Sequence, residues 1–498
     1  MTPLAPTTDA ISQSIVAIVV LAVFVLLARE TAHRVVITIG AVALLWGISY
    51  LTPFHLLTFE SARDALDVNV LLLLASMMAL VGVLRSTGVF EWGVRHIMRA
   101  AGGRPIVLLA LVAWFTAVAS AFLDNVTTVI FVAPMVIAMA RQMGMSPAPL
   151  LLPMIMAANI GGTASLIGDP PNMMIASGSG LTFLAFLANL ALPCALMMCW
   201  LEFYTRRRFR DEFRVAGANR KTLSNELVAI ENSQLARWLG IICLAVLVGF
   251  LTAHLTGMPP AVPALIGAAA ALIAQDVLYV RTQRPSAQER MHGVLAITER
   301  DIEWPTLSFF VFLFIVVGAA VSTGLIASLA DGLQWIIARS TTSFALTPRG
   351  TLLFASLLIC WASGIFSALI DNIPYVAVSI PILLRLTPTL SGDSDALWWA
   401  LSLGACLGGN ATVIGASANV TTIGLAEREG ARISFAYFAR YATPMTAGTL
   451  LIASAFLALH VYFGATTTQV SMAVAVAVIG AWRIWHERAS RDTEHTDT

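Results

Sequence analysis

Two acidic residues lie inside otherwise apolar stretches and are the first candidates for chemistry. Asp124 falls within WFTAVASAFLDNVTTVIFVAP at 114–134, and Asp371 falls within WASGIFSALIDNIPYVAVSIP at 361–381. A carboxylate at the centre of a bilayer costs about 2.5–3.5 kcal/mol on insertion scales, so an interaction must offset that cost. A desolvated carboxyl group holds a proton more tightly, whereas a bound cation favours the ionised form. Either behaviour suits ion coupling.

The residues beside each aspartate supply further oxygen ligands. Asn125 and Thr127 follow Asp124, and Asn372 follows Asp371, so amide and hydroxyl oxygens can complete a cation shell. The alternative is that each aspartate caps the following helix by accepting hydrogen bonds from free backbone N–H groups. A neutral Ser or Asn would cap at lower cost, which favours ion binding.

A second motif predicts broken helices at membrane depth. The run GGTASLIGDPPN at 161–172 contains paired glycines and prolines, which interrupt a helix. Irregular backbone at this depth is tolerated only where it is buried in protein or lines a cavity. The half-helix after Pro170 and Pro171 presents the positive end of its dipole, which suits an anion or the carboxylate of Asp169. Close helix packing through small residues is the alternative explanation.

These motifs recur 247 residues later, which indicates an internal duplication. Asp124 and Asn125 pair with Asp371 and Asn372, while GGNATVIGASAN at 408–419 matches the broken-helix motif. The second copy has Ala-Ser-Ala in place of Asp-Pro-Pro, so the two ion-binding corners need not be equivalent. The candidate site residues are therefore Asp124, Asn125, Thr127, Gly162, Gly168, Asp169, Asn172, Asp371, Asn372, Gly409, Asn410 and Asn419.

The elements that position these residues are membrane spans. The chain is 58% hydrophobic and 11% charged, whereas soluble proteins have about 25% charged residues. Because a span needs about 20 apolar residues, we predict an all-α membrane protein with eleven spans and two re-entrant hairpins, 106–140 and 350–388. The spans are 11–28, 34–51, 68–85, 147–178, 181–205, 237–256, 260–280, 306–325, 397–424, 441–463 and 466–484.

The span count predicts that the two repeats have inverted topology. Five spans separate the starts of the repeats, and inverted repeats are typical of secondary transporters with a binding site near the midplane. We predict a first repeat at 1–205, a cytoplasmic linker at 206–236, a second repeat at 237–463 and a last span with a tail at 464–498.

Arginine placement predicts the orientation of the chain. The loops 206–221 and 281–300 are rich in Arg and are therefore expected in the cytoplasm. Counting spans from these loops puts the N-terminus outside and the C-terminus in the cytoplasm of an inner-membrane protein. His33 lies at a loop edge and is expected to face the membrane interface.

Composition excludes several other functions. A formal net charge of +1 offers no electrostatic footprint for nucleic acid. The single lysine, Lys221, follows no glycine-rich loop, so active transport must use an ion gradient or a separate ATPase subunit, which no motif indicates. The five cysteines lack metal-site or redox spacing, and we expect no cofactor beyond a possible bound sodium ion.

The motifs LDNVTT, NIGGTASLIGDPPN, IDNIP and ACLGGNATVIGASANV resemble the ion-transporter superfamily of arsenite permeases, NhaD-type sodium/proton antiporters and divalent-anion/sodium symporters, with the P protein branch closest. The resemblance implies a homodimer with a scaffold part and a transport part that moves as an elevator. It also implies sodium binding at hairpin tips and unwound helices. Both tips carry Asp-Asn where the symporters carry Ser-Asn-Thr, which favours proton-linked or antiport behaviour.

Several functions follow from these observations. The leading prediction is a proton- or sodium-coupled carrier of a small inorganic ion, with arsenite or antimonite efflux and sodium/proton antiport as the main cases. The alternative is a sodium-coupled importer of di- or tricarboxylates, for which no membrane-depth Arg or Lys is evident as an anchor. A channel and an intramembrane aspartyl protease using Asp124 and Asp371 are the remaining alternatives.

Overall fold

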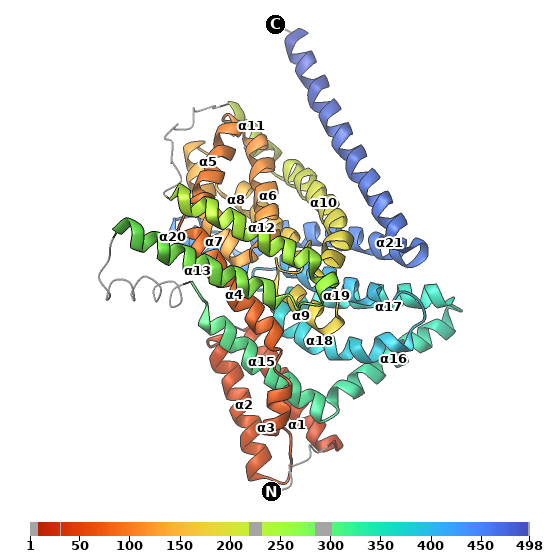
Figure 1. Cartoon of the computed structure of the whole chain (residues 1–498). Helices are drawn as coiled ribbons and strands as arrows, with labels where there is room; N and C mark the ends of the chain where they lie inside the picture. The colour runs from red at the N-terminus through yellow and green to blue at the C-terminus, as the bar shows by residue number, and fades with distance from the viewer. Residues whose placement is uncertain (1–7, 30, 219–231, 284–300, 497–498) are drawn as a thin grey trace.

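All regular secondary structure in the described residues is helical. The structure is a computed structural model and describes residues 8–29, 31–218, 232–283 and 301–496 (Figure 1). Lys221 and positions 284–300 of the predicted cytoplasmic loop lie outside these ranges. The helices of the first half are α1 (Ala10–Ala28), α2 (Arg34–Leu51), α3 (Phe59–Asp64), α4 (Val68–Arg85), α5 (Val89–Ala101), α6 (Pro105–Phe122), α7 (Asn125–Gln142), α8 (Ala148–Thr163), α9 (Pro170–Ser179), α10 (Phe183–Arg208) and α11 (Arg210–Ala218).

The second half has the same character and ends in a long kinked helix. Gly464 adopts φ 79° and ψ 169° and divides that helix in two, at the boundary predicted between the last two spans. The helices are α12 (Ser233–Thr256), α13 (Ala261–Gln283), α15 (Trp304–Ser322), α16 (Leu325–Ser343), α17 (Pro348–Leu369), α18 (Asn372–Leu386), α19 (Asp395–Gly408), α20 (Ser417–Arg428) and α21 (Phe435–Thr496), with 3-10 turns at Thr387–Thr389 and Gly409–Ala411.

Eleven helices of the described residues are long and apolar enough to cross a membrane. The predicted number is therefore confirmed, but its membership differs. The expected spans 147–178 and 397–424 are broken, as their glycine and proline motifs predict, since α8 ends at Thr163 and α19 at Gly408. Three hairpin arms, α6, α7 and α17, are among the eleven instead, and the two halves of α21 count as one.

The two halves of the chain repeat the same helix boundaries. The helices α7 and α18 begin at Asn125 and Asn372, and α9 and α20 begin at Pro170 and Ser417, 247 residues apart in both cases. The packing repeats as well, because α6 packs on α8 as α17 packs on α19. The halves also interlock, with α7 against α20 and α18 against α9. Their inverted orientation and the re-entrant nature of the hairpins stay predictions.

Glycine permits the closest helix contacts in both copies. A Cβ atom on Gly161 of α8 would overlap the backbone carbonyl of Ala117 in α6. The equivalent glycine, Gly408 of α19, meets the carbonyl of Gly364 in α17 in the same way. Each broken segment is therefore fixed against its own hairpin by backbone contact, which a larger residue would prevent.

The buried apolar side chains form two main clusters. The larger cluster contains the hairpin arms, the broken segments and α10. The smaller cluster joins α1, α2 and α3 to α15 and α16, and these helices lie at the end of the molecule where the chain begins (Figure 1). The chain thus has two packing units that meet at α4, α15 and the hairpin tips.

We expect Gly161→Ala to destabilise the protein by about 1–3 kcal/mol, because the new methyl group must displace the α6 backbone. The control is Gly240→Ala in α12, where a Cβ atom meets nothing within 4 Å. Apparent melting temperature in detergent compares the two variants. Equal melting temperatures for both would contradict the close-packing explanation.

Candidate functional site

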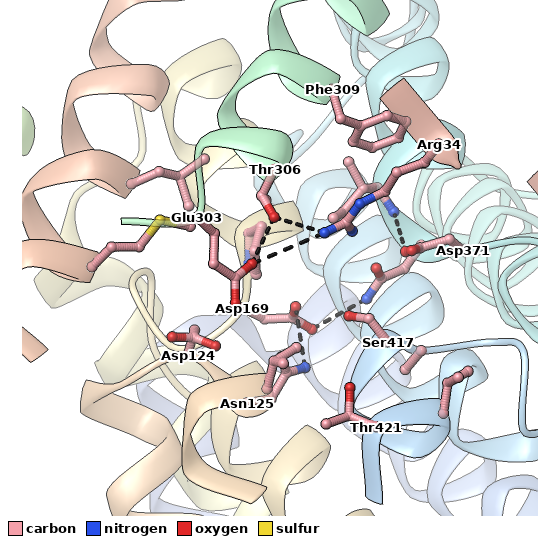
Figure 2. Close-up of a pocket in the computed structure, with 18 of the residues that line it drawn as sticks. Arg34, Asp124, Asn125, Asp169, Glu303, Thr306, Phe309, Asp371, Ser417 and Thr421 are labelled. Carbon is pink, nitrogen blue, oxygen red and sulfur yellow. Dashed lines mark hydrogen bonds and ion pairs between the residues drawn. The ribbon is translucent and has the colours of Figure 1, made fainter. Parts of the chain in front are cut away.

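The two hairpin tips and the first broken segment border one cavity of about 510 Å³. Figure 2 shows its polar side chains, with Asp124 and Asp169 facing a common space and Arg34 entering from the side of Asp371. The polar and charged residues that line the cavity are His33, Arg34, Asp124, Asn125, Asp169, Glu303, Thr306, Asp371, Asn372, Ser417 and Thr421.

Both predicted aspartates stand at helix N-termini within this cavity. The Asp124 carboxylate accepts a hydrogen bond of 2.7 Å from the backbone N–H of Thr127 at the start of α7. Asp371 accepts one of 3.3 Å from the N–H of Ile373 at the start of α18. Each aspartate therefore does cap the helix that follows it, as the alternative explanation in the sequence analysis predicts. It does not account for the position of both carboxylates at one cavity, where a neutral cap would be sufficient.

Asp169 connects the two hairpins. Its side chain is 2% exposed, and its two carboxylate oxygens accept hydrogen bonds from Asn125 at 3.5 Å and from Asn372 at 3.3 Å. The charges of Asp124 and Asp371 also act on it. One carboxylate from the first copy thus contacts the equivalent asparagine of each hairpin tip.

Asn159 is a functional candidate that the sequence analysis missed. Its side-chain oxygen accepts a hydrogen bond of 3.0 Å from Asn125. Its amide donates to Asn410 at 2.7 Å and to Asn419 at 3.0 Å, so it joins the first hairpin tip to the second broken segment. The available signal was a buried Asn inside the apolar run before Gly161. The residue 247 positions later is Cys406, so comparison of the repeats did not select it.

Asn172 and Asn419 hold the broken backbone rather than lining the cavity. The Asn172 amide donates to the carbonyl oxygens of Thr163 at 3.1 Å and Ser165 at 2.9 Å. The Asn419 amide donates to Gly409 and Thr412, both at 2.8 Å. Because the breaks free backbone carbonyls from the helices, these amides replace hydrogen bonds that water cannot supply at this depth.

The remaining predicted residues lie behind the cavity wall. Thr127 meets Asp124 through its backbone, and Asn410 is fully buried against Asn159. Gly162 and Gly168 approach each other so that a Cβ on Gly162 would lie 2.7 Å from the Gly168 carbonyl oxygen. Gly409 repeats this contact in the second copy. The structure therefore brings five of the twelve candidates to the cavity itself, namely Asp124, Asn125, Asp169, Asp371 and Asn372.

The opposite wall carries a cation that the sequence analysis did not place at the site. Arg34, the first residue of α2, donates a hydrogen bond of 2.6 Å to Thr306 and lies 4.0 Å from the Glu303 carboxylate. Thr306 in turn donates to Glu303 at 2.6 Å. No membrane-depth Arg or Lys was evident in the sequence as an anchor for an anion, and the structure places Arg34 at the cavity. His33, expected at the membrane interface, borders the same cavity.

The lining carries an excess of acidic groups. Four carboxyl groups, of Asp124, Asp169, Asp371 and Glu303, face one guanidinium group. In the described part of the chain, no group of three or more His, Cys, Asp or Glu side chains has the arrangement of a metal site. The lining offers carboxylate and amide oxygens, which suit protons or hard cations.

Comparison with known proteins decides the family. Residues 22–404 match the family described as Citrate transporter (CitMHS). The chain belongs to the citrate transporter family. The match extends from the second half of α1 into α19, so it includes both hairpins and most of the residues that line the cavity.

Several relatives of this citrate transporter family protein are named as transporters. It is 34% identical to "Uncharacterized transporter Rv2684" of Mycobacterium tuberculosis over 90% of this chain and 99% of the relative. It is 29% identical to the human P protein over 89% of this chain and 59% of that longer protein. The solved structure of the Alcanivorax borkumensis YdaH transporter superposes on this chain with a TM-score of 0.57 at 16% sequence identity. The superposition covers 87% of this chain and 99% of YdaH, whose topology is described as unusual.

These matches confirm the resemblance to the ion-transporter superfamily and to P protein. The citrate transporter family protein is a multi-pass membrane protein and a secondary transporter, not an enzyme. The aspartyl protease alternative is therefore wrong. The likeness to YdaH concerns the fold alone.

We expect Asn159→Leu to lower the melting temperature markedly, because three buried amides lose a partner and each unsatisfied group costs about 1–3 kcal/mol. Asn189→Leu in α10 is the matched control, since the Asn189 amide bonds only to the Ala185 carbonyl of its own helix. Thermal unfolding in detergent provides the comparison. If Asn159→Leu unfolds at the same temperature as the control, the asparagine network does not hold the two copies together.

Proposed function

We propose that this protein is a cation-coupled secondary carrier whose coupling ion, a proton or sodium, binds among Asp124, Asp169 and Asp371. The observation that supports this proposal is the position of Asp169, hydrogen-bonded to one asparagine of each hairpin tip within a cavity that both tip aspartates border. Three carboxylates that border one cavity repel one another, so binding of a proton or a cation is favoured among them.

The two corners of this site differ in chemistry. The first copy supplies Asp169 and Asn159, whereas the second has Ala416 and Cys406 at the equivalent positions. The second corner therefore has fewer anionic oxygens for a cation. We infer that the coupling ion binds on the side of the first hairpin tip and Asp169, and that the second corner has room for a transported species.

Two packing units on opposite sides of the cavity support movement of one against the other. The hairpin tips belong to the larger apolar cluster, whereas Arg34 begins α2 of the smaller cluster. Displacement of the larger unit past the smaller one would carry the site across the membrane, as an elevator does. We propose a homodimer on the resemblance alone, and an N-terminus outside and a C-terminus inside the inner membrane on arginine placement.

Sodium/proton antiport is the transport reaction that the acidic lining supports best. A net excess of three negative charges attracts small cations and repels polyanions. Arsenite or antimonite efflux remains the other case predicted from the sequence. Both reactions use the same carboxylates as the coupling site.

A second candidate, import of a di- or tricarboxylate with cations, is favoured by Arg34. Its planar guanidinium group suits a substrate carboxylate, and it faces the cavity from the wall opposite the first hairpin tip. The family description names citrate as a substrate. In this candidate the acidic groups bind the accompanying cations, so the excess negative charge is compensated.

We expect Asp169→Asn to reduce ion-driven flux by about tenfold or more, which corresponds to about 1.4 kcal/mol. The amide keeps the shape of the side chain but removes the charge that a coupling cation requires. Asp124→Asn and Asp371→Asn are expected to act in the same direction. Flux is measured in proteoliposomes with imposed pH and sodium gradients.

Asp276→Asn is the control for these variants, because Asp276 lies on membrane helix α13 outside the cavity lining. It should retain the flux of the unmodified protein. The proposed coupling site would be wrong if all three cavity variants carried ions as fast as Asp276→Asn does. Flux that follows electrochemical diffusion without saturation or counter-transport would instead identify a channel.

We expect Arg34→Gln to separate the two candidate functions. For a carboxylate importer, uptake of radiolabelled citrate or succinate should fall by about tenfold, because a charge-assisted hydrogen bond is worth about 1.5–3 kcal/mol. Arg385→Gln, an exposed arginine at the far end of α18, should leave uptake unchanged. The absence of any citrate or succinate uptake by the unmodified protein under either gradient would eliminate this candidate and leave the cation site intact.

A further inference from the structure

A second cavity of about 540 Å³ lies behind the wall of the ion cavity. It is bounded by α4, α5, α6 and α12, and α12 leaves this space open because it packs chiefly on α13. The two cavities share three wall residues, Met77, Val81 and Ile167. Leu123, the residue before Asp124, also borders the second cavity. Its contents therefore contact the back of the first hairpin tip.

The lining of this second cavity offers nothing for water to bond. Apart from Gly93, the Cys243 thiol and the indole of Trp92, its residues are aliphatic, Met and Phe side chains. Cavities lined by apolar groups do not hold water, and protein interiors leave few voids of this size. Its volume lies within the range of about 300–1,000 Å³ that binds small-molecule ligands. An apolar ligand is therefore the expected occupant.

The edges of the second cavity face the hydrocarbon of the bilayer. Leu244 of α12 is 61% exposed and Val118 of α6 is 56% exposed, and both border the opening. Both helices are among those long and apolar enough to cross a membrane. A lipid acyl chain can thus enter from the side without passing through water.

One rim of the opening has the composition of a membrane interface. Trp92 of α5 borders the cavity, and its ring lies 4.0 Å from that of His96. Arg99 lies on the same helix face, since positions i, i+4 and i+7 align, about 10 Å further along the axis. Tryptophan is typical of the headgroup level, and an exposed arginine there attracts anionic headgroups.

We propose that this second cavity binds one acyl chain of an anionic phospholipid, with its phosphate group near His96 and Arg99. The bound chain fills the space behind Met77, Val81 and Ile167 and so supports the shared wall of the ion cavity. This inference does not depend on which ion or substrate the protein carries. A neighbouring copy of the chain is the competing occupant.

Two tryptophan variants of one helix test the proposal. Leu244→Trp fills the cavity, whereas Ile241→Trp does not, although both side chains are apolar and 61% exposed. The delipidated protein is titrated with phosphatidylglycerol and examined by native mass spectrometry and thermal unfolding. We expect the unmodified protein and Ile241→Trp to retain one more lipid than Leu244→Trp, with a lipid-dependent rise in melting temperature that Leu244→Trp lacks.

A second pair of variants covers the case in which Leu244→Trp does not fold. Val118→Trp fills the cavity from α6, and Ile106→Trp, also exposed on α6, is its control. Arg99→Gln should reduce the preference for phosphatidylglycerol over phosphatidylcholine. Equal lipid retention by cavity and control variants would overturn the proposal. Efficient cross-linking of Leu244→Cys between two copies in the membrane would also overturn it, by identifying the second copy as the occupant.

Discussion

Helices that stop at membrane depth leave backbone groups that must bond within the protein, and this requirement organises the structure. At each break a side-chain hydroxyl bonds across to the hairpin: Ser165 donates to the carbonyl of Ala121, and Thr412 donates to that of Ala368 at 2.6 Å. The same hydroxyls accept from Gly168 and Gly415, each at 3.1 Å. The break and the hairpin tip are therefore one rigid unit, and the tip aspartates are positioned by contacts that have no role in binding.

Both copies of the repeat share the contacts that hold the broken helices to their hairpins. The residues that differ between the copies are the ones that make the two sides of the cavity chemically different. The hydroxyl contacts of the breaks recur 247 residues apart at equal distances, and the Asn172–Ser165 contact of 2.9 Å recurs as the Asn419–Thr412 contact of 2.8 Å. The first copy then adds Asp169 and Asn159, which the second copy replaces by Ala416 and Cys406. Both hairpin tips keep an aspartate, but only the first copy adds the carboxylate of Asp169, so the two corners share a backbone and differ in chemistry.

Sequence patterns were sufficient for features that depend on contiguous residues. The hairpin arms, the breaks at Gly161 and Gly408 and the kink at Gly464 follow from apolar length and from glycine and proline positions. Arg34 could not be predicted as a cavity residue, because its position at the start of α2 looks like an ordinary interfacial arginine. Only the packing of α2 against α15 brings it to the hairpin tips. Asn159 was missed because two of its three partners lie more than 240 residues away and its equivalent in the second copy is Cys406.

The two cavities share a wall, so the proposed acyl chain and the proposed coupling ion would lie on its opposite faces. Met77, Val81 and Ile167 have polar space on one side and apolar space on the other. Side chains with empty space on one face lose dispersion contacts there, so these three side chains are more easily displaced than fully packed ones. Any movement of the first hairpin tip must displace Leu123 and Asp124 together, since they are adjacent in the chain. The proposed acyl chain would therefore pack against the back of the same hairpin tip whose displacement the proposed carrier mechanism requires.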